Sequence, residues 1–148
     1  MSKLEEFLAG DRPDDVALYL ADEYLDGEGK IARIGESVEG GVVLVVPGEE
    51  GRRAFAAGTG TDAMAFARGA MDTEGRIDSD IGGGECPEAD AGDSEAADGA
   101  HRVAFVFAFA EERNEEVGGI YAEGDVIHAY ARCTCGTDYS DRWVVGER

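Results

Sequence analysis

The chain has 148 residues, 33 acidic and 13 basic, which give a net charge of −20, and 43% of its residues are hydrophobic. This length fits a single domain over residues 1–148 with its own core, and the hydrophobic share argues against a disordered acidic chain. Because no basic stretch with interleaved aromatic residues occurs and no apolar run approaches a bilayer span, nucleic-acid binding and membrane insertion are not expected.

The residue types also indicate the environment of the protein. Three cysteines are an odd number, unsuited to a closed disulfide framework, and the first ten residues lack the basic start and apolar run of a secretory signal. Only Lys3 and Lys30 are lysines, so carboxylates dominate the charge, as expected for a protein that must stay hydrated at high salt. We therefore predict a cytoplasmic protein from a salt-adapted organism.

The N-terminal part is expected to begin with helices. Residues 2–5 have the spacing of a capping box, which predicts a short helix that ends near Gly10. Residues 11–15 provide a cap and a first-turn proline for a second helix over residues 16–24. The apolar block 16–21 also fits a strand, and both interpretations remain open at this point.

The next segment predicts a hairpin followed by a helix. Residues 42–46 are an unbroken valine-rich run, which is typical of a strand buried on both faces. Residues 47–51 predict a turn and residues 52–57 an antiparallel partner strand. A helix should then begin with Thr61 as its cap and stop by Gly75, with Met64, Ala67 and Met71 at helical spacing.

Residues 76–100 lack periodicity. Residues 85–98, from Glu85 to Asp98 inclusive, contain six acids and no basic residue, with alanine, glycine and serine among them. We predict an acidic low-complexity loop at about residues 78–100.

The C-terminal third predicts a meander of strands. In residues 103–110 large side chains (Val103, Phe105, Phe107, Phe109) alternate with mostly small ones, which predicts a central strand. Residues 117–122 and 125–135 are expected to be two more strands. The end of the chain, with Tyr139 and Trp143, is expected to pack on the sheet, and the alternative is an exposed aromatic patch for a partner.

Together these elements predict an α+β domain. We expect a mostly antiparallel sheet of about five strands with two or three helices packed on one face.

One group of residues has the chemistry of a zinc site. Cys86, Cys133, Cys135 and His101 supply thiolate and imidazole ligands, and metal content after purification without chelator would test the assignment. Strand geometry favours a different role, because residues two apart point the same way. Cys133 and Cys135 would then share an apolar face with residues 127, 129 and 131, while His128 lies on the opposite face with Tyr130 and Arg132.

Other chemical motifs are weaker. Residues 58–63 fit G-x-G-x-x-A, and Asp78 follows, but a dinucleotide site needs a parallel strand before the motif. Asp62 would also place negative charge near a pyrophosphate. No nucleophile elbow, H-E-x-x-H or P-loop occurs, and the enzyme hypothesis depends on Cys133 or Cys135 as a reactive thiol.

Four stretches resemble a small haloarchaeal family that is a domain of unknown function. They are RPDDVALYLADEYL, GGVVLVVPGEEG, FAFAEERNEEVGGIYAEGD and CTCGTDYSDRW. The resemblance covers nearly the whole chain outside the acidic loop and implies a haloarchaeal source. It implies no activity and no site residues.

The sequence therefore favours a non-enzymatic binding or regulatory module, with zinc stabilising the fold if the four ligands meet. Its partner would be a protein or a small molecule, and an exposed edge strand would allow a homodimer. The alternative is a small cysteine-dependent enzyme or redox protein that uses Cys133 or Cys135. Thiol accessibility separates the two, because a reactive cysteine must be partly exposed.

Overall fold

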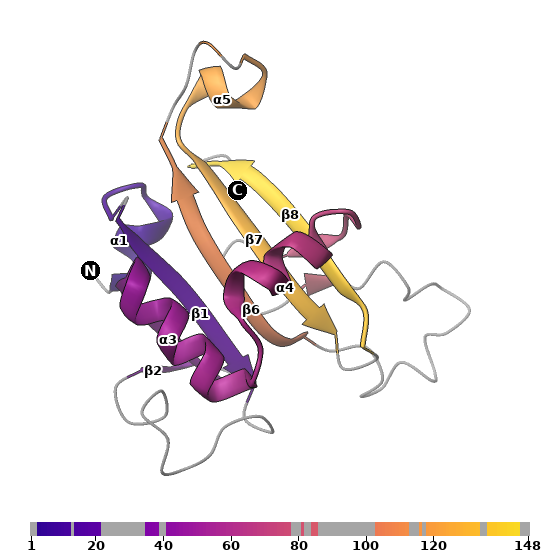
Figure 1. The fold of residues 1–148 in the computed structure, drawn as a ribbon. Helices are drawn as coiled ribbons and strands as arrows, with labels where there is room; N and C mark the ends of the chain where they lie inside the picture. Colours follow the sequence, from indigo (N-terminus) through magenta and orange to yellow (C-terminus); the bar gives the residue numbers. More distant parts are fainter. Residues whose placement is uncertain are drawn as a thin grey trace.

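The computed structural model of the chain places a six-stranded antiparallel sheet at its centre, in the order β2-β3-β1-β6-β7-β8 (Figure 1). The residues that the structure describes are 3–12, 14–21, 35–38, 41–77, 81, 84–85, 103–112, 116, 118–133 and 136–145. The strands of this sheet are β1 (Asp15–Ala21), β2 (Glu36–Val38), β3 (Gly41–Pro47), β6 (Val103–Glu111), β7 (Val126–Cys133) and β8 (Asp138–Val144). The predicted α+β class and the mostly antiparallel sheet are confirmed.

Strand β1 lies between β3 and β6 in the middle of the sheet. Every residue from Val16 to Ala21 is buried, which requires cover on both faces and hydrogen-bonded strands on both sides. The helix expected from residue 16 onward is therefore wrong for these residues, and the alternative strand is correct. The valine-rich run of β3 is also buried throughout, as predicted.

The segment after β3 is a helix and not the predicted turn and strand. Helix α3 (Gly48–Thr59) carries Glu49 and Glu50 in its first turn, where acids favour the positive end of the helix. Its buried residues include Gly51, Ala54 and Phe55, whose spacing is helical. The predicted strand over residues 52–57 is therefore wrong. The buried side of α3 carries mostly small residues, so the helical periodicity of this segment was weak in the sequence.

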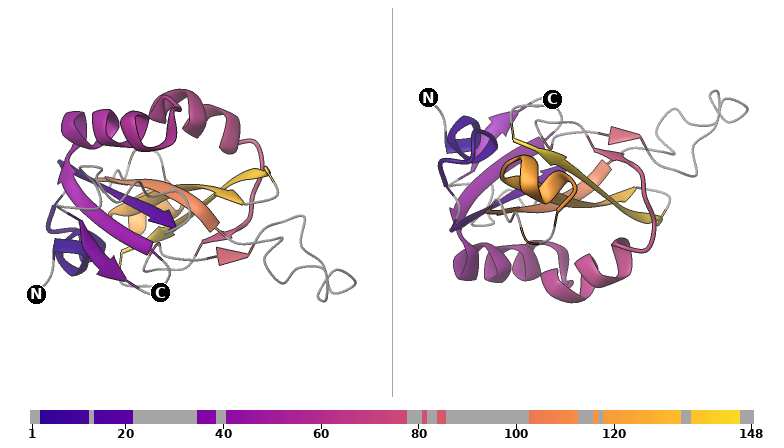
Figure 2. Two further views of the ribbon diagram at one scale, coloured as in Figure 1. Left: turned by 90° about the horizontal axis from the view of Figure 1, so that it is seen from below. Right: turned by 90° about the horizontal axis from the view of Figure 1, so that it is seen from above.

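The helices form layers on both faces of the sheet (Figure 2). Helices α3 and α4 (Ala63–Ala70) cover one face, here called the α3/α4 face, where Phe55 packs against Phe66, Phe105 and Phe107. Helix α1 (Lys3–Leu8) covers part of the opposite face, the α1 face. The buried residues of the α1 face include Phe7, Tyr19, Ile77, Ile81, Val106, Ile127, Ala129, Cys133, Tyr139 and Trp143.

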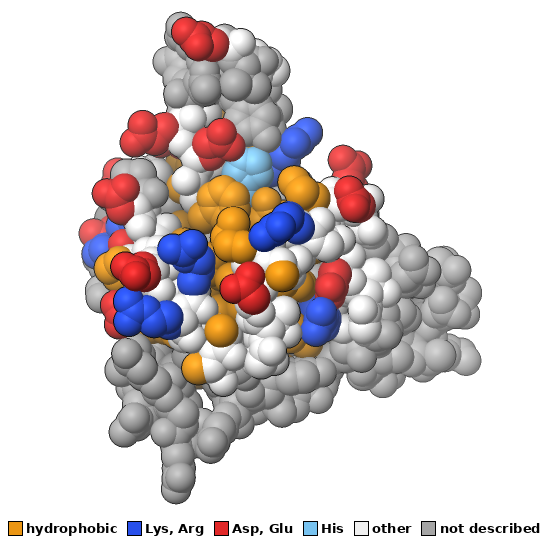
Figure 3. Space-filling view, in the orientation of Figure 1, with side chains coloured by type: hydrophobic (Ala, Val, Ile, Leu, Met, Phe, Trp, Pro, Cys, Tyr) orange, Lys and Arg blue, Asp and Glu red, His pale blue; other side chains and the backbone are white. Residues whose placement is uncertain are grey.

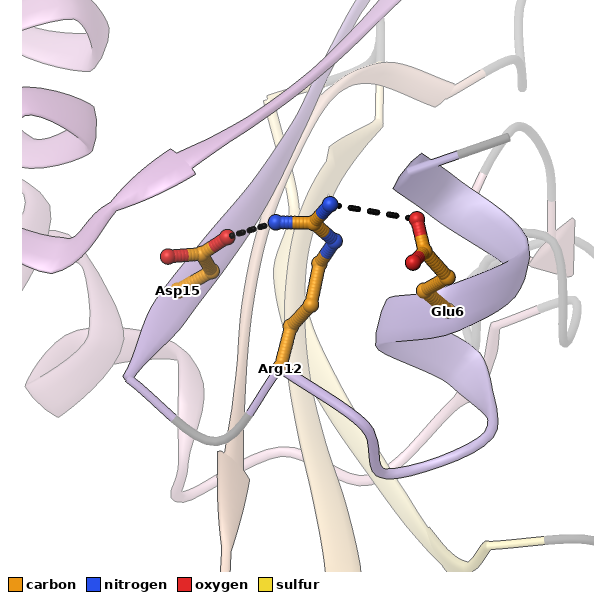
Figure 4. Close-up of polar contacts among 3 residues, drawn as sticks. All are labelled: Glu6, Arg12 and Asp15. Atoms are coloured by element: carbon orange, nitrogen blue, oxygen red, sulfur yellow. Dashed lines mark hydrogen bonds and ion pairs between the residues drawn. The ribbon is translucent and has the colours of Figure 1, made fainter. Parts of the chain in front are cut away.

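An arginine connects α1 to the sheet (Figure 4). Arg12 donates one hydrogen bond to Glu6 of α1 and one to Asp15 at the start of β1, each at 3.1 Å. The bonds to Glu6 and then Asp15 raise the pKa of Arg12 above its ordinary value. The guanidinium therefore holds the helix end and the strand start together.

The C-terminal meander differs from the prediction in three places. A bulge between Val103 and Phe105 turns Val103 to the α1 face, so it does not share a face with Phe105 as expected. The predicted strand over residues 117–122 is wrong, because Gly118 and Gly119 have positive φ angles of 79° and 59° and lead into a short helix, α5 (Ile120–Glu123). Residues 138–144 form a strand, β8, that was expected only as a packed segment.

Strand β8 is an edge strand that another segment of the chain covers. The amide of Ser140 donates to the carbonyl of Thr73 (2.8 Å), and the amide of Gly75 donates to the carbonyl of Ser140 (3.0 Å). Part of this edge is therefore unavailable for pairing with another chain. The opposite edge is β2, which is only three residues long.

Of the predicted acidic loop, the structure describes only Ile81 and β5 (Gly84–Glu85), which pairs with β4 (Arg76–Ile77). The rest of residues 78–100 lies outside the described residues. None of the helices in the described part of the chain is long and apolar enough to span a membrane.

Candidate functional site

The predicted zinc ligands are only partly described. Cys133 is 1% exposed on the α1 face with Ile127, Ala129 and Ala131, as strand geometry predicted. Strand β7 ends there, because the amide of Cys133 donates to Thr137 across a hairpin turn. Cys86, His101 and Cys135 lie outside the described residues, and among the described ones no cluster of His, Cys, Asp or Glu could hold a metal ion. The zinc site stays a prediction.

The G-x-G-x-x-A segment connects two helices and follows no strand. Gly60 ends α3 with a φ of 73°, and the carboxylate of Asp62 caps α4 by accepting from the amide of Ala65 at 2.9 Å. The predicted cap, Thr61, is one residue too early. The glycine and the acid thus have structural roles in a tight helix-to-helix connection.

Three aromatic side chains stack in a row on the α3/α4 face. The Phe109 ring lies 5.1 Å from the His128 ring and 5.9 Å from the Tyr130 ring, at small interplanar angles. Phe109 of β6 pairs with His128 of β7, and His128 pairs with Arg142 of β8. Residues opposite each other in antiparallel strands share a face, so Arg142 extends the row toward the sheet edge.

The imidazole in this row has a fixed orientation. Nε2 of His128 lies 2.8 Å from Oε1 of Glu111, at the end of β6. An ionised carboxylate can only accept a hydrogen bond, so we assign the proton to Nε2. Stacking on Phe109 restrains the ring plane as well.

A hollow of about 370 Å³ opens beside His128 on the α3/α4 face, and we call it the His128 hollow. Its floor is formed by β7 and β8, and its wall by the segment that follows α4. The lining residues are Met71, Glu74, Gly75, His128, Tyr130, Ser140, Asp141 and Arg142.

The wall of the His128 hollow is held in place by hydrogen bonds to β8. Beside the two backbone bonds of Ser140, its hydroxyl donates to the carbonyl of Thr73 at 3.2 Å. The amide of Ile77 donates to Oδ2 of Asp141 at 3.0 Å, and Oδ1 accepts from the amide of Arg142 at 2.8 Å. Ser140 and Asp141 therefore shape the hollow.

A second hollow of about 240 Å³ lies on the same face near the start of α3, and we call it the Phe109 hollow. Its lining is mostly apolar. The lining residues are Val16, Gly48, Glu49, Arg52, Met64, Phe107 and Phe109.

Each hollow is lined by one exposed methionine. Met64 is 40% exposed and Met71 is 57% exposed, and they are the exposed large hydrophobic residues of the described part of the chain. Met64 lines the Phe109 hollow and Met71 the His128 hollow. Figure 3 shows the hydrophobic patch on this face, with a histidine at its edge and arginine and acidic side chains around it.

Sequence reasoning found part of this site. The period of two in β7 placed His128, Tyr130 and Arg132 together, which is confirmed. It did not find the hollows. The sequence placed Met64, Ala67 and Met71 on one apolar side of the helix, whereas in the structure Ala67 is buried and the two methionines are exposed. The signal that could have identified the buried side of α4 was the helical spacing of its buried residues, Ala63, Phe66, Ala67 and Ala70.

Comparison with known proteins identifies the family of the chain and no individual similar protein. A model described as a family of unknown function (DUF5807) matches residues 35–146. No curated protein and no solved structure matches the chain.

Proposed function

The chain belongs to this family of unknown function, and from the geometry of its site we propose that it is a non-enzymatic binding module. The binding surface would be the part of the α3/α4 face around the His128 and Phe109 hollows. One observation carries the proposal: Met64 and Met71 are the exposed large hydrophobic residues of the described chain, and each lines one hollow.

Apolar side chains that face water are energetically unfavourable, and they stand out on a strongly acidic protein. Its net charge of −20 indicates a surface dominated by carboxylates, so solvent-facing thioethers beside aromatic rings are unusual there. Methionine is flexible and polarisable, so it adapts to different ligand shapes and makes favourable contacts with rings. Binding would remove this surface from water.

The alternative of a cysteine-dependent enzyme has less support. A reactive thiol needs partial exposure and an electropositive environment. Cys133 is 1% exposed among apolar side chains, which fits a core residue. The alternative then depends on Cys135, outside the described residues.

The methionines provide the test. The chain has three methionines, Met1, Met64 and Met71, so protein labelled with [methyl-¹³C]methionine gives three methyl signals that Met64→Leu and Met71→Leu variants assign. Titration with a library of water-soluble fragments should produce saturable shifts of the Met64 or Met71 signal while Met1 stays unchanged. If no fragment shifts either signal, or if Met1 always shifts equally, the α3/α4 face is not a binding surface.

A further inference from the structure

We propose that the His128 hollow binds a small organic monoanion with a flat apolar body, of the class of aromatic carboxylates. The inference rests on the proposed function and names the ligand class of that surface. In this arrangement Arg142 binds the anionic group, and Tyr130 and Met71 contact the ring.

The size of the hollow sets the first limit. Small-molecule sites usually enclose ~300–1,000 Å³, and the His128 hollow, at about 370 Å³, is at the lower end of this range. Its wall is fixed to β8 through Ser140 and Asp141, so the space exists before a ligand enters. A preformed site avoids the cost of ordering a loop on binding.

Arg142 is the group suited to hold an anion. Two arginines lie on this face of the β7–β8 pair, Arg132 and Arg142, and of these two Arg142 is the one in the lining of the hollow. Arg142 is exposed and lines the hollow directly beside His128. A guanidinium binds a carboxylate through two parallel hydrogen bonds.

The acids at the hollow limit the charge of the ligand. Both oxygens of Asp141 accept hydrogen bonds from backbone amides, so this carboxylate is committed to the fold. Glu74 is exposed and also lines the hollow. A second negative charge on the ligand would be repelled there, which favours a monoanion over a dicarboxylate or a polyphosphate.

The apolar part of the lining favours a flat ligand. Tyr130 belongs to the stacked row with Phe109, and a ring entering the hollow would meet Tyr130 and His128. Met71, 57% exposed, supplies a thioether, and sulfur–ring contacts are favourable at about 5 Å.

The test uses benzoate as the probe, followed by the methyl signals of Met71 and Met64. Benzoate should shift the Met71 signal more than the Met64 signal, with a Kd on the order of 1 mM. Benzyl alcohol, which has no charge, and phthalate, which has two, should each bind about tenfold more weakly or worse. Cyclohexanecarboxylate, which is not flat, should also bind more weakly than benzoate.

Variants of two exposed arginines separate a specific contact from general charge. Arg142→Gln should weaken benzoate binding by about tenfold, and Arg142→Lys should recover only part of the loss because lysine lacks the planar fork. Arg68→Gln, on α4 and not in the lining of the hollow, should leave the affinity unchanged. Circular dichroism of each variant checks that the fold is retained.

Two results would overturn the ligand class. Equal binding of benzyl alcohol and benzoate, unaffected by Arg142→Gln, would remove the anion from the proposal while the α3/α4 face remains a binding surface. Shifts of Met64 alone would move the ligand to the Phe109 hollow. Failure of the proposed function has a separate signature, which is that no fragment shifts either methionine.

Discussion

The two faces of the sheet are built from the same strands and yet differ in how completely they are covered. Along β7, Ile127, Ala129 and Ala131 point to the α1 face and are fully buried, and Cys133 is 1% exposed. The alternate residues point to the α3/α4 face, where His128 lines a hollow that reaches the surface. One strand therefore contributes core on one face and a candidate site on the other.

The lengths of the elements explain part of this difference. Helix α4 has eight residues, so it spans ~12 Å, whereas the eight residues of β7 extend over ~27 Å. A helix of this length cannot cover the strand it packs on from end to end. The His128 hollow opens where the helix layer stops, just after Met71.

The largest expected effect is the loss of unfolding free energy when a core side chain of the α1 face is truncated. Ile127→Ala removes a fully buried side chain from the α1 face and should lower the free energy of unfolding by ~2–5 kcal/mol, because a cavity remains in a packed core. Guanidinium unfolding followed by fluorescence of Trp143, which lies opposite Ile127 in β8, measures this change.

The matched variant is Met71→Ala on the α3/α4 face. Since Met71 is 57% exposed, its truncation should change the unfolding free energy, measured in the same way, by less than ~0.5 kcal/mol. If Met71→Ala destabilised the protein as much as Ile127→Ala, the two faces would not differ as described.

The sequence predicted the elements whose pattern is local. The valines of β3 and the alternation in β6 predicted two strands, and the period of two in β7 separated His128 from Cys133. Residues 16–21 fitted a helix as well as a strand, because a short apolar run without a polar side does not fix the period. In α3 the glycines at 48, 51 and 58 suggested turns, and only the folded structure shows that Gly51 permits close packing.

The candidate site depends on contacts that no local pattern contains. Its wall forms because the amide of Ile77 reaches the carboxylate of Asp141, 64 residues away in the chain. The row of Phe109 and His128 requires the pairing of β6 with β7 in one register. The sequence placed His128 and Tyr130 on one face of β7, whereas it predicted neither their stacking on Phe109 nor the hollow beside them.

A pair of glycines tests how closely α3 approaches the sheet, with the exposed Gly69 of α4 as the control. A Cβ atom at Gly51 of α3 would overlap Cγ2 of Val16, whereas at Gly69 of α4 it would meet nothing within 4 Å. Gly51→Ala should cost ~1–2 kcal/mol of unfolding free energy, because valine is stiff at χ1 and the strain exceeds the gain in helix propensity. Gly69→Ala should stabilise the protein by ~0.5–1 kcal/mol. Thermal melts of both variants measure the two signs, and a stabilising Gly51→Ala would contradict close packing of α3.

The smallest expected effect concerns the cover of the α1 face. Arg12→Gln removes the ion pairs with Glu6 and Asp15, so the end of α1 should open more often while global stability changes little. Hydrogen exchange at the amides of Ala9 and Asp11, which bond to the carbonyls of Glu5 and Glu6, should accelerate several-fold.

Salt provides the control for the Arg12 variant. The side chains of Arg12 and Glu6 are 30% and 35% exposed, so their attraction is screened by salt, and the difference in exchange between the two proteins should shrink in molar KCl. A difference that persists at high salt would mean that Arg12 holds α1 through hydrogen-bond geometry and packing more than through charge. The contact that holds α1 on the sheet would then depend on packing, as the core of the α1 face does. The α1 face and the α3/α4 face would differ more clearly in how they are covered.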